Sequence, residues 1–231
     1  MPYILSIETS TQICSVALSQ AEKVISLQEI EQKNAHAAHI TLLIERCMEE
    51  AALSLSALDA VAVSMGPGSY TGLRIGLSTA KGICYALDKP LIAVDTLQSL
   101  GKALADVDGN REDTLYCPMI DARRMEVYTT FYDSKAKEVS QKEALVLEDG
   151  IFGKLFEDKV SRLVFGGDGA HKTSSISIDG KTLLSDIQCS ARHIAPLAYE
   201  SYRMKRFQDV AYSSPFYLKS PNITKSKKKL L

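Results

Sequence analysis

Tryptophan is absent from this chain, and so are several patterns that mark whole classes of protein. No apolar run approaches the ~20 residues that a membrane-spanning helix needs, and the first ten residues lack the basic region of a secretory signal. Basic and acidic residues number 27 and 28, so a net charge of −1 provides no general attraction to nucleic acid. We expect a cytoplasmic protein that does not associate with membranes.

Neither the cysteines nor any short catalytic motif in the sequence indicates an enzyme. The five cysteines are odd in number and widely spaced, with no CxxC pair, which favours free thiols in a reducing compartment. HExxH, GxxxxGK[ST] and a recognisable Ser-His-Asp arrangement are missing as well. The residues themselves therefore give little support to catalysis.

The chain of 231 residues is long enough to form two small lobes. Hydrophobic residues make up 45% and charged residues 24%, which is ordinary for a globular protein. The polar window 106–113 (DVDGNRED) is followed by a second series of strands and helices that resembles the first. We predict two lobes, 1–105 and 106–231, that share one duplicated α/β plan, with the last helix or the tail packed back on the first lobe.

Hydrophobic periodicity predicts the individual elements. Alternation predicts an antiparallel meander of three strands at the edge of the first sheet, and helical spacing predicts two long helices after it. The expected strands are 3–7, 13–18, 22–30, 60–64, 91–94, 114–120, 125–132, 137–147 and 162–165. The expected helices are 35–53, 71–87, 96–104, 149–156 and 190–207, with Asn34 and Thr96 as N-caps of the first and third.

The stretch 64–82 (SMGPGSYTGLRIGLSTAKG) organises the first lobe. A buried strand enters it, and a glycine turn then leads into a helix. Gly72, Gly76 and Ala80 lie four residues apart on one face of that helix. Because glycine inside a helix costs up to about 1 kcal/mol, we attribute this stripe to close approach by a second protein's helix. Replacing either glycine by leucine should then leave the monomer folded but abolish partner binding.

Three segments have the composition of ligand-binding loops. One follows the first strand, one enters the glycine-bearing helix, and one ends the strand 162–165. Their residues are Glu8, Thr9, Ser10, Gly66, Gly68, Ser69, Gly167, Asp168 and Gly169. A carboxylate can orient a metal-bound water, and N–H groups at a helix start attract phosphate. A phosphate-holding hairpin usually needs glycine, however, and the first segment has none, so a turn stabilised by its own hydroxyls is favoured there.

Two other polar patterns have simple structural explanations. His36 and His39 lie three residues apart at a helix start, but no third or fourth metal ligand is evident nearby, and we interpret them as surface or interface residues. The turn in 121–128 (DARRMEVY) can bind an acidic partner or RNA phosphate, although a salt-bridged hairpin is the commoner explanation. The lysine-rich tail, Lys225 to Lys229, is interpreted as solvated.

The chain resembles the TsaB (YeaZ) family in five motifs, which recur in the family's order between Ile4 and Lys219. They are ILSIETST, GPGSYTGLRIGLSTAKGI, DARRMEVY, GGDGA and PFYLK. The resemblance implies an α/β fold of the actin-like, Hsp70-like and sugar-kinase-like (ASKHA) class. Such a fold has two lobes, each with a mixed sheet flanked by helices.

The resemblance also implies a non-catalytic role. Proteins of this family pair with a TsaD-like catalytic subunit and cooperate with a TsaE-like ATPase. The complex transfers a threonylcarbamoyl group from its adenylate to the adenosine beside the anticodon of tRNAs that read ANN codons. ATP and metal are then expected on the partner subunits rather than on this chain, and tRNA contact is expected through the complex.

The family's partner surface corresponds to the helices 35–53 and 71–87. The resemblance implies the interface residues His36, His39, Leu43, Gly72, Arg74, Ile75, Gly76, Thr79 and Ile83. The same face can serve as a homodimer surface in the isolated chain.

Two rival hypotheses stay open. The first is an ATP-dependent enzyme of the sugar-kinase type, with Glu8 near a metal and the loops at Gly66 and Gly167 holding phosphates. The second, weaker one is a metallohydrolase that uses His36 and His39. TsaD-like relatives carry an HxxxH motif, whereas the two histidines here have a different spacing, and this departure disfavours the second hypothesis.

Overall fold

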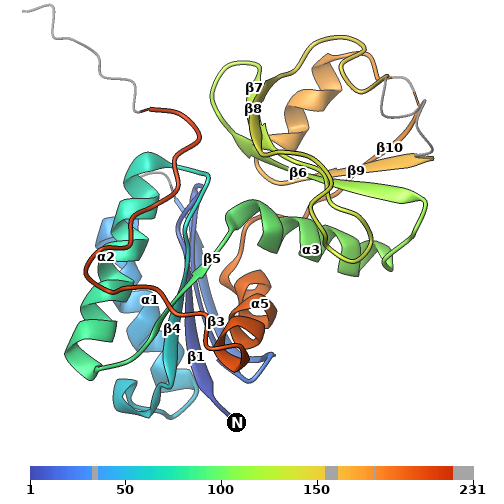
Figure 1. Cartoon of the computed structure of the whole chain (residues 1–231). Helices are drawn as coiled ribbons and strands as arrows, with labels where there is room; N and C mark the ends of the chain where they lie inside the picture. Colours follow the sequence, from blue (N-terminus) through green and yellow to red (C-terminus); the bar gives the residue numbers. More distant parts are fainter. Residues whose placement is uncertain (33–35, 154–160, 179, 221–231) are drawn as a thin grey trace, which may run out of the picture.

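A computed structural model shows two lobes, each built on a five-stranded sheet, with a long helix running between them (Figure 1). The structure describes residues 1–32, 36–153, 161–178 and 180–220. Within those residues, no helix is both long enough and apolar enough to cross a membrane.

The first sheet has the strand order β3-β2-β1-β4-β5. Its strands are β1 (Tyr3–Glu8), β2 (Ile13–Gln20), β3 (Lys23–Glu31), β4 (Ala60–Ser64) and β5 (Leu91–Val94). The first three form the predicted antiparallel meander, with β3 at the edge. β1, β4 and β5 pair in parallel, and β4 is buried along its whole length, as expected for a strand that is covered on both faces.

Helices cover both faces of this sheet. α1 (His36–Glu50) and α2 (Tyr70–Leu87) pack on one face, where Leu5, Val61 and Leu91 belong to their shared core. α5 (Ala191–Arg203) packs on the other face, against Ile4 and Ile92. Neighbouring residues along each strand therefore point to opposite layers, which is the period-two alternation of a pleated strand. The last helix thus lies on the first lobe, far from its own position in the sequence.

The second sheet repeats the arrangement of the first. Its strands are β6 (Thr114–Asp121), β7 (Glu126–Thr129), β8 (Glu143–Val146), β9 (Arg162–Gly166) and β10 (Lys181–Leu184), in the order β10-β9-β6-β7-β8. β6, β7 and β8 form an antiparallel meander, and β9 and β10 continue from β6 in parallel. The predicted duplication is confirmed, although β10 was not predicted from its sequence.

Several predicted boundaries need correction. α3 (Thr96–Asp108) is capped by Asp95, whose carboxylate accepts a hydrogen bond from Gln98 N, and not by Thr96. Thr96 Oγ1 instead accepts a hydrogen bond from Gly66 N at 3.2 Å. α3 also runs past residue 104 and α5 ends before 207. Asn34 and most of the helix expected over 149–156 lie outside the described residues.

The segment 204–220, which we call the C-terminal strap, runs along α2 (Figure 1). Lys81 Nζ donates to two strap carbonyls, at 3.0 Å to Ala211 O and 2.7 Å to Ser213 O. Arg74 Nε donates to Tyr217 Oη at 3.2 Å. One side of α2 is therefore occupied by the chain's own C-terminal part.

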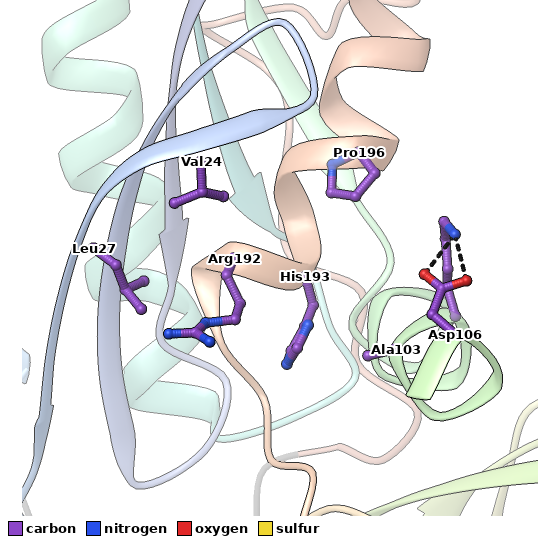
Figure 2. A pocket seen from close by; sticks show the side chains of 8 residues that line it. Val24, Leu27, Ala103, Asp106, Arg192, His193 and Pro196 are labelled. Carbon is purple, nitrogen blue, oxygen red and sulfur yellow. Dashed lines mark hydrogen bonds and ion pairs between the residues drawn. The ribbon is translucent and has the colours of Figure 1, made fainter. Parts of the chain in front are cut away.

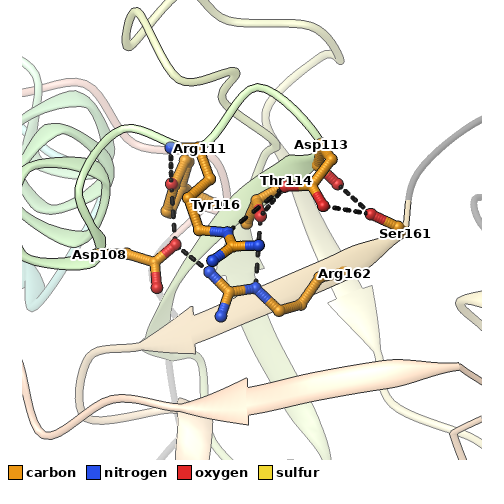
Figure 3. Close-up of polar contacts among 7 residues, drawn as sticks. All are labelled: Asp108, Arg111, Asp113, Thr114, Tyr116, Ser161 and Arg162. Carbon is orange, nitrogen blue, oxygen red and sulfur yellow. Dashed lines mark hydrogen bonds and ion pairs between the residues drawn. The ribbon is translucent and has the colours of Figure 1, made fainter.

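A polar cluster anchors the end of α3 to the second sheet (Figure 3). Asp108 forms an ion pair with Arg162 of β9 and accepts a hydrogen bond from Tyr116 Oη of β6 at 3.0 Å. Tyr116 Oη in turn accepts from Arg111 N at 3.0 Å. The Asp108 and Arg162 side chains are only 12% and 22% exposed. Removing either one therefore leaves the charged atoms of the other without their ion-pair partner and with little access to water.

Asp108→Ala should lower the free energy of unfolding by about 2 kcal/mol, because it leaves Arg162 and Tyr116 without their acceptor. The matched control is Asp106→Ala, which removes a 46% exposed carboxylate paired with Lys102 one helical turn away. That change should cost no more than about 0.5 kcal/mol. Chemical denaturation measures both values, and equal losses would contradict an anchoring role for the cluster.

Candidate functional site

The turn after β1 directs its carboxylate inward. Glu8 is completely buried, and its Oε1 accepts hydrogen bonds from Ser10 N at 2.7 Å and Ser64 Oγ at 2.8 Å. Burial raises the pKa of Glu8 above its ordinary value, and these hydrogen bonds offset part of that rise. The Glu8 carboxylate therefore stabilises the turn. The prediction that the turn's own hydroxyls do so is wrong, because the hydroxyls of Thr9, Ser10 and Thr11 have no hydrogen-bond partner within the described residues.

The glycine stripe of α2 packs on this turn. A Cβ on Gly72 would lie 2.1 Å from Thr9 O, and a Cβ on Gly76 would lie 2.2 Å from Thr9 Oγ1. Both glycines are buried within the chain. The prediction that they are free to meet a second subunit is therefore wrong, and leucine at either position would not leave the monomer undisturbed. Glycine is required because the β1–β2 turn of this same chain approaches the helix.

The loop before α2 also contacts the turn directly. Ser69 N donates to Ser10 O at 2.7 Å, and a Cβ on Gly68 would lie 2.6 Å from Ser10 Cβ. Ser69 Oγ caps α2 by accepting from Gly72 N at 3.2 Å. Gly66 has a φ of +108°, which only glycine adopts easily. Gly66 N, Ser69 N and Ser69 Oγ of this loop are thus hydrogen-bonded within the protein.

The loop of the second lobe is likewise held by internal bonds. Gly167, with a φ of +100°, donates to Ile187 O at 2.8 Å. Asp168 Oδ1 accepts from Asp121 N at 2.9 Å, and burial raises the pKa of Asp168. Gly169 N donates to Met119 O at 3.0 Å.

A buried thiol, Cys189, packs in a hydrophobic cluster with Leu97, Leu100 and Tyr116. Burial raises the pKa of Cys189 well above its ordinary value, and the Glu8 and Asp168 carboxylates raise it further. The sequence did not single out this cysteine, because no pattern in the residues around 189 distinguishes it.

A nucleotide and its metal, which many enzymes of this fold class bind, do not fit these residues. The turn at Thr9 and the loop 66–69, which were both expected to hold phosphate, are in direct contact with each other. Glu8 Oε2 and Thr9 Oγ1 have no hydrogen-bond partner, but they are enclosed by protein atoms. In the described part of the chain, no three His, Cys, Asp or Glu side chains are grouped so as to hold a metal ion.

Some of the residues expected at the partner surface of α1 and α2 are buried within the chain. Leu43 is only 4% exposed and belongs to the core of the first lobe, so its assignment to the interface is corrected. His36 is also buried, with no hydrogen-bond partner for Nε2. His39 is half-buried and Arg74 is exposed beside the strap.

One row of α2 remains accessible. Ile75, Thr79 and Ile83 follow one another at intervals of four residues and are all half-buried. The two isoleucines border the core of the first lobe. This row is one part of α2 that can meet another protein, beside the more exposed Thr71, Ser78, Gly82 and Tyr85.

A separate cavity of about 460 Å³ lies between β3, α3 and α5 (Figure 2). Its lining residues are Val24, Leu27, Lys102, Ala103, Asp106, Arg192, His193 and Pro196. Burial, with Arg192 adding to it, lowers the pKa of His193 to about 4, so the imidazole is neutral at pH 7. The lining comes from three distant segments, and no single stretch of sequence could indicate it.

The fold and the interlocked loops define the class of protein. Two lobes with the same strand order, joined by α3 and with α5 packed back on the first sheet, form an α/β protein of the ASKHA class. Component A of (R)-2-hydroxyglutaryl-CoA dehydratase from Acidaminococcus fermentans shares this fold with a TM-score of 0.51 at 8% identity, over 89% of this chain and 100% of that one.

Comparison with known sequences and structures then identifies the family. The model of the family described as "TsaD: tRNA N6-adenosine threonylcarbamoyltransferase" matches residues 23–229. A TsaB protein of Bacillus subtilis is 31% identical over 74% of this chain and 72% of its own length. A TsaB protein of Escherichia coli is 27% identical over 94% of each chain. YeaZ from Pseudomonas aeruginosa superposes with a TM-score of 0.79 at 25% identity, covering 94% of this chain and 100% of its own. The chain belongs to the TsaB (YeaZ) family.

Gly76→Ala should lower the free energy of unfolding by about 2 kcal/mol, because its Cβ overlaps the Thr9 hydroxyl and forces the turn to move. Gly82→Ala is the matched control in the same helix, since a Cβ there meets nothing within 4 Å. That control should stabilise the protein by up to about 1 kcal/mol. Equal effects in thermal denaturation would show that α2 and the turn are not in close contact.

Glu8→Gln should gain stability relative to the parent as pH rises. The raised pKa of Glu8 means that ionisation of this carboxyl destabilises the folded state of the parent. This loss of stability is absent below the ordinary pKa of 4.5 and grows as pH rises through the pKa of Glu8 in the folded protein. Glutamine keeps an oxygen to accept from Ser10 and Ser64 without that loss.

Glu50→Gln is the control of opposite sign. Hydrogen bonds from Ser26 and Gln28 lower the pKa of Glu50, so this variant should lose stability relative to the parent as pH rises from about 4 to 8. Denaturation curves at pH 4 and pH 8 measure both trends. A pH-independent difference for Glu8→Gln would contradict the buried state of Glu8.

Proposed function

We propose that this chain is the non-catalytic subunit that pairs with a TsaD-like threonylcarbamoyltransferase and activates it. The complex would modify the adenosine beside the anticodon in tRNAs that read ANN codons. Family membership supports this role, since the relatives from Bacillus subtilis and Escherichia coli are both named tRNA threonylcarbamoyladenosine biosynthesis protein TsaB.

The proposal that this chain is not catalytic rests on the contact between the β1–β2 turn and the loop before α2. The 2.7 Å hydrogen bond from Ser69 N to Ser10 O uses an N–H donor that a phosphate-binding site would leave free. Glu8 is turned inward toward Ser10 and Ser64. These contacts disfavour an ATP-dependent enzyme of the sugar-kinase type, and ATP would then bind to a TsaE-like ATPase that acts with the complex.

The partner surface we propose is the accessible row of α2, Ile75, Thr79 and Ile83, together with His39 of α1. A half-exposed apolar row beside a helix pair provides the contact area that a stable heterodimer needs. The isolated chain would form a homodimer through the same row when the TsaD-like subunit is absent. Its five buried, unpaired cysteines are consistent with a cytoplasmic location for such a complex.

Thr79→Arg tests this surface. It places a charge between Ile75 and Ile83 on an already half-exposed position, so the monomer should keep its melting temperature while co-purification with the TsaD-like subunit falls at least tenfold, which corresponds to about 1.4 kcal/mol. The control is Ser174→Arg, which adds the same side chain to an exposed position of the 3-10 helix Ala170–Ser175.

The control variant should co-purify normally. Normal co-purification of Thr79→Arg would place the interface elsewhere. Reconstituted tRNA modification, assayed with each subunit omitted in turn, tests the role itself. Full activity without this chain would overturn the proposed function.

A further inference from the structure

The hairpin turn between β6 and β7 has an unusual backbone for its sequence. Arg123 and Arg124 have φ values of +73° and +51°, and both are exposed. Two consecutive residues with positive φ are normally Asn-Gly or Asp-Gly, because other side chains are disfavoured there. The arginines therefore occupy positions that their backbone preferences do not favour, and only their side chains can give them an advantage at this turn.

The acidic groups of the hairpin are already compensated. Asp121 Oδ1 accepts from Lys172 Nζ and from Arg123 N, each at 2.6 Å. Lys172 Nζ also donates to Glu126 O at 2.8 Å, and the Glu126 carboxylate forms an ion pair with Lys219. This network holds the turn rigid and neutralises its carboxylates. Within the described residues, the guanidinium groups of Arg123 and Arg124 have no ion-pair partner.

The C-terminal strap brings a further basic residue to the same place. The strap runs along α2 (Figure 1). Beyond this helix, Lys219 of the strap forms an ion pair with Glu126 at the start of β7. The whole chain carries a net charge of −1, so the unpaired positive charge at this turn is a local feature of the surface. Four more lysines follow in the sequence, at 225 and 227–229, outside the described residues.

We propose that the β6–β7 hairpin binds the phosphate backbone of RNA through Arg123 and Arg124. A guanidinium presents a planar fork of donors that matches phosphate oxygens, and a rigid turn presents two of them with little loss of freedom on binding. The identity of the RNA as tRNA rests on the proposed function. An acidic protein segment is less well matched, because its carboxylates are less densely and less regularly spaced than backbone phosphates.

The test compares two double variants of the full chain, alone and in complex with the TsaD-like subunit. Arg123→Asn with Arg124→Gly removes both charges but suits the positive φ values. Arg123→Lys with Arg124→Lys keeps both charges. The dissociation constant for tRNA is measured by fluorescence anisotropy at several salt concentrations, and melting temperatures confirm that both variants fold.

Each phosphate contact contributes roughly tenfold to affinity near 0.1 M salt, so the Asn-Gly variant should bind tRNA about a hundredfold more weakly. The slope of log K against log salt should also fall in magnitude by about 1.5 to 2. The Lys-Lys variant should stay within a few-fold of the parent in both measures.

Unchanged affinity and salt slope in the Asn-Gly variant would overturn the proposal. It would also be overturned if binding were lost only on truncation after Ser220, since the tail and not the hairpin would then bind RNA. Weaker co-purification with the TsaD-like or TsaE-like protein at unchanged tRNA affinity would show that the hairpin binds protein. Failure of the parent chain to pair with the TsaD-like subunit would instead count against the proposed function.

Discussion

The structure of the first lobe depends on the contact between the β1–β2 turn and the glycine face of α2. Thr9 lies so close to Gly72 and Gly76 that no Cβ can be accommodated. This contact lets α2 pack tightly over the start of the sheet, and it holds the loop 66–69 against the turn. The same contact engages Ser69 N, an N–H group of the loop that was expected to hold a phosphate. One packing interaction thus stabilises the lobe and ties this loop to the turn.

The remaining parts of the molecule are arranged around that lobe. α5 closes the second face of the first sheet, and α3 leads to the second sheet through the cluster around Asp108. The strap covers one side of α2 and reaches the β6–β7 hairpin. We propose that the row at Thr79 binds the partner and that the hairpin binds RNA. The two proposed surfaces belong to different lobes.

Much of the fold could be predicted from periodicity, because alternating and helical patterns are local. The meander, α2 and the repeated order of elements follow directly from such patterns. β10 could not be predicted, since Lys181–Leu184 is a short exposed strand with no buried face. The glycines of α2 were predicted to admit a second protein's helix, and this was wrong, because sequence alone could not show that their neighbour is Thr9 of the same chain. Leu43 fits a helix face equally well as core or as interface, and only the packing decides.

The central claim is that this chain pairs with a TsaD-like subunit and does not itself hold a nucleotide. Amide hydrogen exchange tests it most directly, with the chain measured alone, with ATP and magnesium, and with the TsaD-like subunit. We expect the partner to slow exchange in α1 and α2, and the nucleotide to leave exchange at 8–11, 66–69 and 166–169 unchanged. Protection of those three loops by ATP, without protection of α1 and α2 by the partner, would contradict it.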